Sequence, residues 1–309
     1  MTLNRALLLI PVFCLLAGPL GAAEPAGNRF TGTPPGQVLV AADSRVVVVS
    51  PTGQVVWEYK SDGLVHDAWK LPDGNVLIGN GRSVAEIAAD KRVVWRFQSE
   101  SGRGDATYAC QRLPNGRTLV GENSTGRILE VDRTGKVVFT LQTQPFTLNV
   151  HGNQRLARKL DNGNYLVCHK DARLVKEYKP TGEVVQELHL PDAAFSAIRT
   201  PQGTTVVGCI SRVMEFDRAG KRVWEFDAKA DATDVAIGAI TGVHLLPSGN
   251  LVLGIYAANT KDGKGCNFLE ISREKKVVWR YCDAKFSHSS MAVQMLDAEG
   301  KALPGVTLR

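Results

Sequence analysis

Short apolar segments separated by turn residues recur along the chain and predict a protein built of β-strands. One hairpin pattern occurs six times, at residues 49–58, 86–96, 131–139, 178–186, 216–224 and 271–279. A second hairpin precedes most of these copies, with turns such as Pro-Asp-Gly at 72–74 and Pro-Asn-Gly at 114–116. Pro and Gly supply the backbone angles that tight turns need, so we expect these turns to define the fold.

Two hairpins per repeat make four short strands, and a repeat of about 48 residues is typical of a β-propeller blade. We therefore predict an all-β, six-bladed β-propeller with four-stranded antiparallel blades, formed as one domain by residues 36–309. The first clear strand, 37–42, matches the second strand of a blade, so the first blade lacks its innermost strand. Residues 291–296 have the pattern of that missing strand. We predict that this C-terminal strand completes the N-terminal blade and closes the ring, which removes exposed strand edges.

The first residues have the features of a secretory signal. Arg5 precedes an apolar stretch at 6–20, and the small residues 21–23 resemble a cleavage site. We predict a signal peptide at 1–23, an N-terminal extension at 24–35, and export to the periplasm or the extracellular space. No later apolar run approaches the length needed to span a membrane.

Charge and composition limit the kinds of partner that we expect. The formal net charge is +6, but Lys and Arg alternate with Asp and Glu in every repeat. This pattern is typical of a solvated surface, so we expect no nucleic-acid partner and a monomeric protein. Asp227, Asp231 and Asp234 share a segment, yet their spacing does not match a calcium loop, and we expect no metal and no cofactor. Residues 123–125 form an Asn-Ser-Thr sequon, which matters only in an organism that glycosylates such sites.

Five cysteines follow the predicted signal peptide. Cys266 and Cys282 flank the hairpin that turns near residue 274, at equal distances from its centre. A cross-strand disulfide between them is one interpretation, and two separate thiols are the other. Cys110 stands in a column held by Ala or Val in other repeats, so we expect it to pack as a small apolar side chain.

The connections between blades vary in length, whereas the hairpin turns within blades are uniformly short. Variable loops on a repetitive scaffold usually carry function, so we assign function to the end of the disc with the variable connections. A rim of histidines for proton transfer or ligand binding is one interpretation, and ordinary strand-end hydrogen bonding is the other. The residues that map to this end are His66, Asp67, Tyr108, His151, Asn153, Arg155, His169 and His288.

Arginines also recur near the start of the third strand of the repeats. A partial circle of guanidinium groups would bind sulfate, phosphate or carboxylate. The alternative is that each arginine pairs with an acid, for example the glutamates at 86, 130, 177, 215 and 270. The arginines concerned are Arg45, Arg82, Arg127, Arg173 and Arg212.

The repeat at residues 66–77 and 127–139 resembles bacterial arylsulfotransferase-like and quinoprotein-like (PQQ-like) propeller repeats. The resemblance to arylsulfotransferases implies six blades and sulfuryl transfer through a channel histidine, with His66, His151 and His288 as counterparts by location. Those enzymes also have an N-terminal domain for which this chain has no room. Quinoprotein dehydrogenases share the Gly-Lys-x-x-Trp turn, but many carry adjacent cysteines that are missing here, so we expect no quinone cofactor.

Three functions follow. The first is a propeller that binds a polar or anionic ligand, such as a glycan, a sulfated compound or a protein partner, on its variable-loop end. The second is an arylsulfotransferase-like or hydrolytic enzyme that uses the histidines at the channel mouth. The third is a structural interaction domain with an undistinguished channel mouth. The enzyme interpretation requires that His66, His151 and His288 converge within hydrogen-bonding reach around one pocket.

Overall fold

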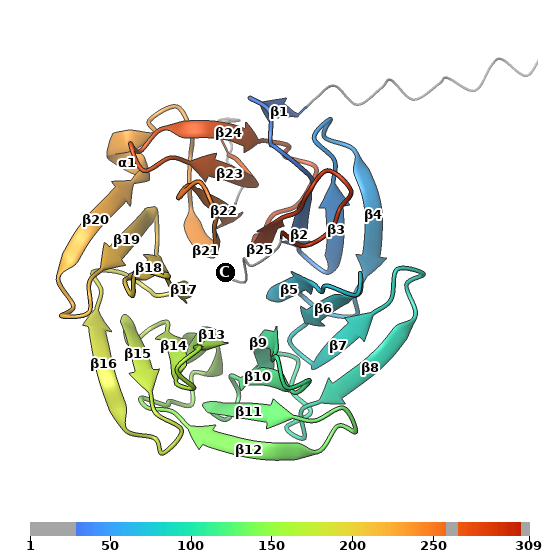
Figure 1. Ribbon diagram of the computed structural model, residues 1–309, viewed down its shortest axis with the longest axis vertical. Coiled ribbons are helices and arrows are strands. Elements are labelled where there is room, and N and C mark those ends of the chain that lie inside the picture. Colours follow the sequence, from blue (N-terminus) through green and yellow to red (C-terminus); the bar gives the residue numbers. More distant parts are fainter. Residues whose placement is uncertain (1–28, 258–264, 304–309) are drawn as a thin grey trace, which may run out of the picture.

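The computed structural model of the protein describes residues 29–257 and 265–303. The predicted signal peptide and the first residues of the predicted extension lie outside the described residues. Six antiparallel sheets surround a central axis as the blades of a propeller (Figure 1). The predicted fold class is confirmed.

Strands in each blade are ordered from the central axis outward. Blade 1 contains β25 (Ser290–Met295), β2 (Val38–Ala42), β3 (Arg45–Val49) and β4 (Val55–Lys60). Blade 2 contains β5 (Asp67–Lys70), β6 (Val76–Gly79), β7 (Ser83–Ile87) and β8 (Val93–Gln98). Blade 3 contains β9 (Thr107–Arg112), β10 (Thr118–Glu122), β11 (Arg127–Val131) and β12 (Val137–Gln142).

The remaining blades repeat this order. Blade 4 contains β13 (Gln154–Lys159), β14 (Tyr165–His169), β15 (Leu174–Tyr178) and β16 (Val184–His189). Blade 5 contains β17 (Ser196–Arg199), β18 (Thr205–Gly208), β19 (Arg212–Phe216) and β20 (Arg222–Asp227). Blade 6 contains β21 (Ala239–Leu245), β22 (Leu251–Tyr256), β23 (Phe268–Ile271), β24 (Val277–Tyr281) and β1 (Phe30–Thr31). Two short helices, η1 (Val150–Gly152) and α1 (Ala228–Asp231), lie in the connections before blades 4 and 6.

Both ends of the described chain close the ring. β25 pairs with β2, as predicted, so that Val293 lies opposite Val40. In addition β1 pairs with the outer edge of β24 and makes blade 6 five-stranded, which the sequence did not indicate. Phe30 of β1 packs edge-on against Phe268, Trp279 and Tyr281. The predicted N-terminal extension thus contributes a strand to the propeller.

Burial differs between inner and outer strands. The second strand of each blade is buried almost throughout, because neighbouring blades cover both of its faces. The outermost strand alternates, as in β8, where Trp95 and Phe97 are buried and their neighbours are exposed. Trp57 of β4 donates its indole hydrogen to the Ala89 carbonyl at 3.0 Å, and so joins blade 1 to blade 2.

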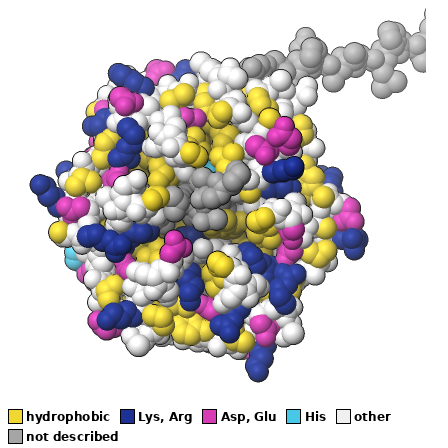
Figure 2. Space-filling view, viewed as in Figure 1, with side chains coloured by type: hydrophobic (Ala, Val, Ile, Leu, Met, Phe, Trp, Pro, Cys, Tyr) yellow, Lys and Arg dark blue, Asp and Glu magenta, His cyan; other side chains and the backbone are white. Residues whose placement is uncertain are grey.

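Ion pairs join neighbouring blades at the end opposite the variable connections. A buried glutamate on the third strand of blades 2 to 5 accepts hydrogen bonds from a cation on the next blade. The pairs are Glu86 with Arg112 and Arg133, Glu130 with Lys159, Glu177 with Arg199, and Glu215 with Arg273. Figure 2 shows the resulting surface, on which basic and acidic side chains are interspersed. In the described parts of the chain, no helix has the length and apolar character needed to cross a membrane.

Candidate functional site

The innermost strands begin around the mouth of the central channel. In blades 1, 3, 4 and 6 the pairing register shifts at this point. Such β-bulges leave residues outside the ladder and re-aim their side chains. In blades 2 and 5 the equivalent residue comes directly before the strand. Each blade thereby contributes one side chain to the mouth: Met291, His66, Tyr108, Arg155, Phe195 and Thr241 for blades 1 to 6 in turn.

A cavity of about 390 Å³ opens at this mouth. It has a volume suited to a small organic molecule. His66, Arg155, Phe195, Thr241 and Met291 are buried in it, with exposures of 9% or less. The other described residues that line it are Leu64, His151, Lys170, Ile210, Gly238, Ala239, Tyr256 and Ser289. No acidic side chain is among these thirteen described residues.

Arg155 is the cation at the base of this cavity, and it is only 6% exposed. Its Nη2 donates to His151 Nε2 at 2.8 Å, and its guanidinium lies 4.8 Å from the centre of the Tyr108 ring. Its Nε and Nη1 are buried and have no hydrogen-bond partner in the described structure. Burial lowers the pKa of Arg155, because the charged form loses its hydration. The site therefore offers two unused donors and a buried charge that makes no ion pair with a carboxylate among the described residues.

His66, Tyr108 and His151 form a chain of contacts beside Arg155. The rings of His66 and Tyr108 lie with centres 3.8 Å apart, tilted by 33° to each other, and Tyr108 Oη lies 3.2 Å from His151 Nδ1. A guanidinium can only donate, so His151 Nε2 accepts and the neutral ring carries its proton on Nδ1. Burial, and then the charge of Arg155, lower the pKa of both histidines, that of His66 well below its ordinary value. Both rings are therefore neutral at pH 7.

Two of the three candidate histidines thus converge. His288 does not line the cavity: its side chain is exposed, and its ring lies 5.3 Å from that of Tyr256 at the rim. Its backbone NH donates to Asp43.

Asp67 and Asn153 lie near the mouth but are engaged within the fold. Asp67 is fully buried, and its carboxylate binds Arg158 at 2.8 Å across the channel. The Asn153 side chain accepts from the Thr147 NH at 2.9 Å and donates to the Thr147 carbonyl at 2.8 Å. These contacts fix the loop before β13. A ligand role for either residue stays a prediction.

His169 lies within blade 4, away from the cavity lining. Its Nε2 lies 2.9 Å from the hydroxyl of Tyr178, which itself donates to the Gln144 carbonyl. Burial lowers the pKa of His169 to about 4. The contacts of His169 support the alternative interpretation of this histidine as a structural residue.

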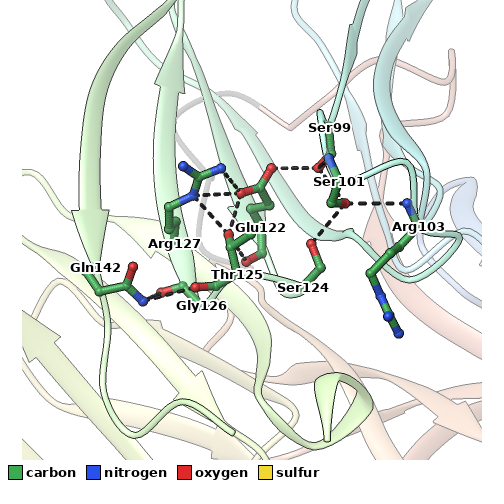
Figure 3. Close-up of polar contacts among 9 residues, drawn as sticks. All are labelled: Ser99, Ser101, Arg103, Glu122, Ser124, Thr125, Gly126, Arg127 and Gln142. Atoms are coloured by element: carbon green, nitrogen blue, oxygen red, sulfur yellow. Dashed lines mark hydrogen bonds and ion pairs between the residues drawn. The ribbon is translucent and has the colours of Figure 1, made fainter. Parts of the chain in front are cut away.

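Arg127 is neutralised by Glu122, which is 1% exposed and also accepts from Ser99 at 2.6 Å (Figure 3). Arg45 and Arg212 likewise pair with acids, Glu58 for Arg45 and Asp227 for Arg212. The alternative of acid pairing thus describes these three arginines, although their partners are not the repeated glutamates named above. Four of those glutamates bind cations at the opposite end of the disc, and Glu270 instead accepts from Asn250 at 2.6 Å and from the Trp279 indole.

The Asn-Ser-Thr sequon at 123–125 lies directly after Glu122. Asn123 is fully buried, and its side-chain NH2 donates to the Val150 carbonyl at 2.7 Å. The nitrogen that a glycan would need is therefore not accessible in the folded protein.

A disulfide joins Cys266 to Cys282, which are on the two sides of the β23–β24 hairpin. Cys110, Cys168 and Cys209 are buried. Burial raises the pKa of Cys168 and of Cys209, the latter to about 12, so these thiols are poor nucleophiles.

Comparison with known proteins agrees with the propeller repeat. A PQQ-repeat family model described as Outer membrane protein assembly factor BamB matches residues 22–158, less than half of the chain. The predicted resemblance to PQQ-like repeats is therefore confirmed, whereas the resemblance to arylsulfotransferases stays a prediction. The search of curated proteins found no match.

Solved structures share the fold. A protein of unknown function from Bacteroides caccae is 23% identical, with a TM-score of 0.73, over 84% of this chain and 98% of that chain. Virginiamycin B lyase from Staphylococcus aureus is 12% identical, with a TM-score of 0.56, over 81% of this chain and 82% of that chain. The WD40 β-propeller domain of Doa1 is 15% identical, with a TM-score of 0.55, over 71% and 72%. Identities this low show a common architecture only.

Sequence reasoning missed Phe195, Thr241 and Met291 at the cavity floor. A signal for them exists in the column of small residues that contains Cys110. The residue two positions before each member of this column, in every blade, is a residue of the channel mouth. Lys170 and Ile210 have no such signal, because they come from connections between second and third strands whose lengths differ. Tyr256 lies at the end of the second strand β22, outside this column.

Proposed function

We propose that this protein is an exported propeller that binds a small organic anion in the cavity at the channel mouth. One observation supports the proposal above others: Arg155 is buried, charged and without a carboxylate partner. Arg158, the other buried arginine of the described chain, is paired with Asp67. A buried charge is costly unless an opposite charge accompanies it, so a bound anion would complete the site.

The neighbours of Arg155 are suited to the same role. His66 and His151 are neutral, so they add no negative charge that would repel a bound anion. Lys170 lies at the cavity wall, paired with Asp171 at 2.7 Å. A carboxylate, sulfonate or sulfate ester could accept from Nε and Nη1 together, the bidentate geometry that guanidinium favours.

Anion binding is tested by thermal denaturation and titration calorimetry with acetate, benzoate, sulfate and phosphate in a chloride buffer. A ligand at 100 times its Kd stabilises the folded state by about 2.7 kcal/mol, so a rise in Tm is expected for the wild type. Arg155→Gln should abolish this rise. Arg173→Gln, at an exposed arginine whose side chain donates to the Pro191 carbonyl, is the matched control and should retain it. A wild type that responds to no anion, or an Arg155→Gln variant that responds equally, would remove the proposal.

A second candidate is an arylsulfotransferase-like or hydrolytic enzyme. The observation that favours it is the convergence of His66 and His151 on Tyr108 in one cavity beside a cation. A neutral imidazole can attack the sulfur of an aryl sulfate, release the phenolate and pass the sulfuryl group to a hydroxyl acceptor. Release of nitrophenol from its sulfate ester, measured for wild type and His66→Ala, decides between the two. Equal rates exclude His66 from catalysis.

Export is part of the proposal. It is supported by the Cys266–Cys282 disulfide, since such bonds persist in oxidising compartments, and by the family description, which names an outer-membrane assembly factor. A protein partner on the same end of the disc and a monomeric state remain predictions. Size-exclusion chromatography with light scattering measures the oligomeric state.

A further inference from the structure

Exposed apolar side chains gather at the rim of the cavity. Most large apolar side chains that are exposed in the described chain are valines on the outermost strands, such as Val55 and Val56. Four others remain, and three of them line the cavity: Leu64, Ile210 and Tyr256, which are 54%, 47% and 41% exposed. Leu64 lies in the connection from β4 to β5, Ile210 in the connection from β18 to β19, and Tyr256 at the end of β22. Exposed apolar groups around a concave site are typical of ligand contact.

The depth of the cavity separates charge from apolar surface. Arg155 is 6% exposed and lies at the base, beside Phe195 and Met291. Leu64 and Ile210 are about half exposed and lie at the opening. A ligand bound to Arg155 would therefore extend toward the opening, and the part behind its charged group could lie against these apolar side chains.

The positive charge at the base of the cavity is small. Arg155 supplies one positive charge, and Lys170 is paired with Asp171 at 2.7 Å. His66 and His151 are neutral at pH 7 because burial lowers the pKa of each. One uncompensated cation in a buried site matches a monoanion, whereas a dianion would leave an excess negative charge without water.

We infer that the cavity binds an amphipathic organic monoanion head first, with its carboxylate or sulfate group on Arg155 and its apolar body against Leu64, Ile210 and Tyr256. This inference rests on the proposed function, because it specifies which anion the Arg155 site accepts. The ligand class is an aliphatic or aryl acid of moderate size.

A homologous series of straight-chain carboxylates, from acetate to octanoate, tests the inference by titration calorimetry on the full chain. Affinity should rise by up to about fourfold per methylene until the chain passes the rim, since each buried methylene adds to the transfer free energy. The amides of the same acids should bind at least tenfold more weakly, because they cannot neutralise Arg155. Phosphate should bind more weakly than octanoate.

The rim is tested by exposed positions whose replacement does not disturb packing. Leu64→Ser with Ile210→Ser should weaken octanoate by about tenfold and leave acetate unchanged. Val55→Ser with Val56→Ser, at exposed apolar positions on β4, is the matched control and should change neither.

The outcomes separate the inference from the function on which it rests. If no anion binds, the proposed function fails. If anions bind but octanoate is no tighter than acetate, or phosphate is tighter than both, the function stands and the inference is wrong. Equal binding of amides, or an octanoate affinity that the rim double variant leaves intact, also overturns it.

Discussion

Arg155→Met and Arg158→Met form a matched pair of substitutions. Both arginines lie on β13, and they are 6% and 5% exposed, so the change in volume is the same and the burial is closely similar. They differ in their partners: Arg158 binds Asp67, whereas Arg155 has no carboxylate. We expect the two variants to change stability in opposite directions.

Removal of Arg158 leaves a charged group inside the protein. Asp67 is fully buried, and without Arg158 its carboxylate would keep the hydrogen bond from the Cys110 NH at 3.0 Å. Breaking a buried ion pair from one side costs about 3–5 kcal/mol. For a chain of this size that corresponds to a Tm lower by roughly 10 °C.

Removal of Arg155 has both stabilising and destabilising effects on the folded protein. It eliminates two buried donors without partners, each of which costs about 1–3 kcal/mol. Against this, the variant loses the hydrogen bond to His151, worth about 1 kcal/mol, and the contact with the Tyr108 ring, worth about 0.5–1 kcal/mol. The net result is a gain of about 1 kcal/mol in the free energy of unfolding of the ligand-free protein.

Urea and thermal unfolding, followed by tryptophan fluorescence, measure both values; the chain has five tryptophans. The expected order of stability is Arg155→Met above wild type above Arg158→Met, in the absence of ligand. If Arg155→Met loses as much stability as Arg158→Met, Arg155 has a structural role equal to that of its neighbour. The argument for an anion site at Arg155 would then be refuted.

Three further results are expected. The folded pKa of His169 is about 4 and the unfolded value about 6.5, so stability should fall by about 3 kcal/mol as the pH drops from 6.5 to 4. In urea unfolding across this range, the free energy of unfolding of His169→Gln should depend less steeply on pH than that of the wild type. An equally steep dependence would contradict the assignment. Replacing Cys266 and Cys282 together by Ser removes a disulfide that spans 16 residues and should lower the free energy of unfolding by about 3 kcal/mol. Reduction of the wild type should have the same effect, so identical unfolding midpoints for the reduced and oxidised wild type would contradict this prediction. Phe30→Ala should cost about 3 kcal/mol through the lost packing on blade 6, and calorimetry that shows less than about 0.5 kcal/mol would mean that β1 is not held there.

The repeated hairpins made the blades predictable from the sequence. The glycine at position 74, whose φ is 88°, is required by the turn that joins β5 to β6, and comparable turns recur in the other blades. Ring closure by β25 followed from counting strands. β1 was not predictable in the same way, because two residues carry no periodicity and their pairing depends on the open edge of β24.

The candidate site was predictable in part. His66, His151 and Arg155 do line one cavity, and Tyr108 contacts all three, because the starts of innermost strands meet around an axis in any propeller. Which polar groups are already satisfied was not predictable. The partner of Asn153 is a loop backbone whose path depends on tertiary packing, and the sequence alone does not show it.

The pairing of β25 with β2 has a consequence for biosynthesis. The innermost strand of blade 1, β25, is synthesised after all five other blades, whereas its partner β2 is synthesised before them. The inner edge of β2 therefore stays unpaired until β25 is available. Contacts of such long sequence separation form slowly, and an unpaired edge invites aggregation. This delay would suit the export proposed above, because blade 1 stays incompletely folded while the intervening blades are made.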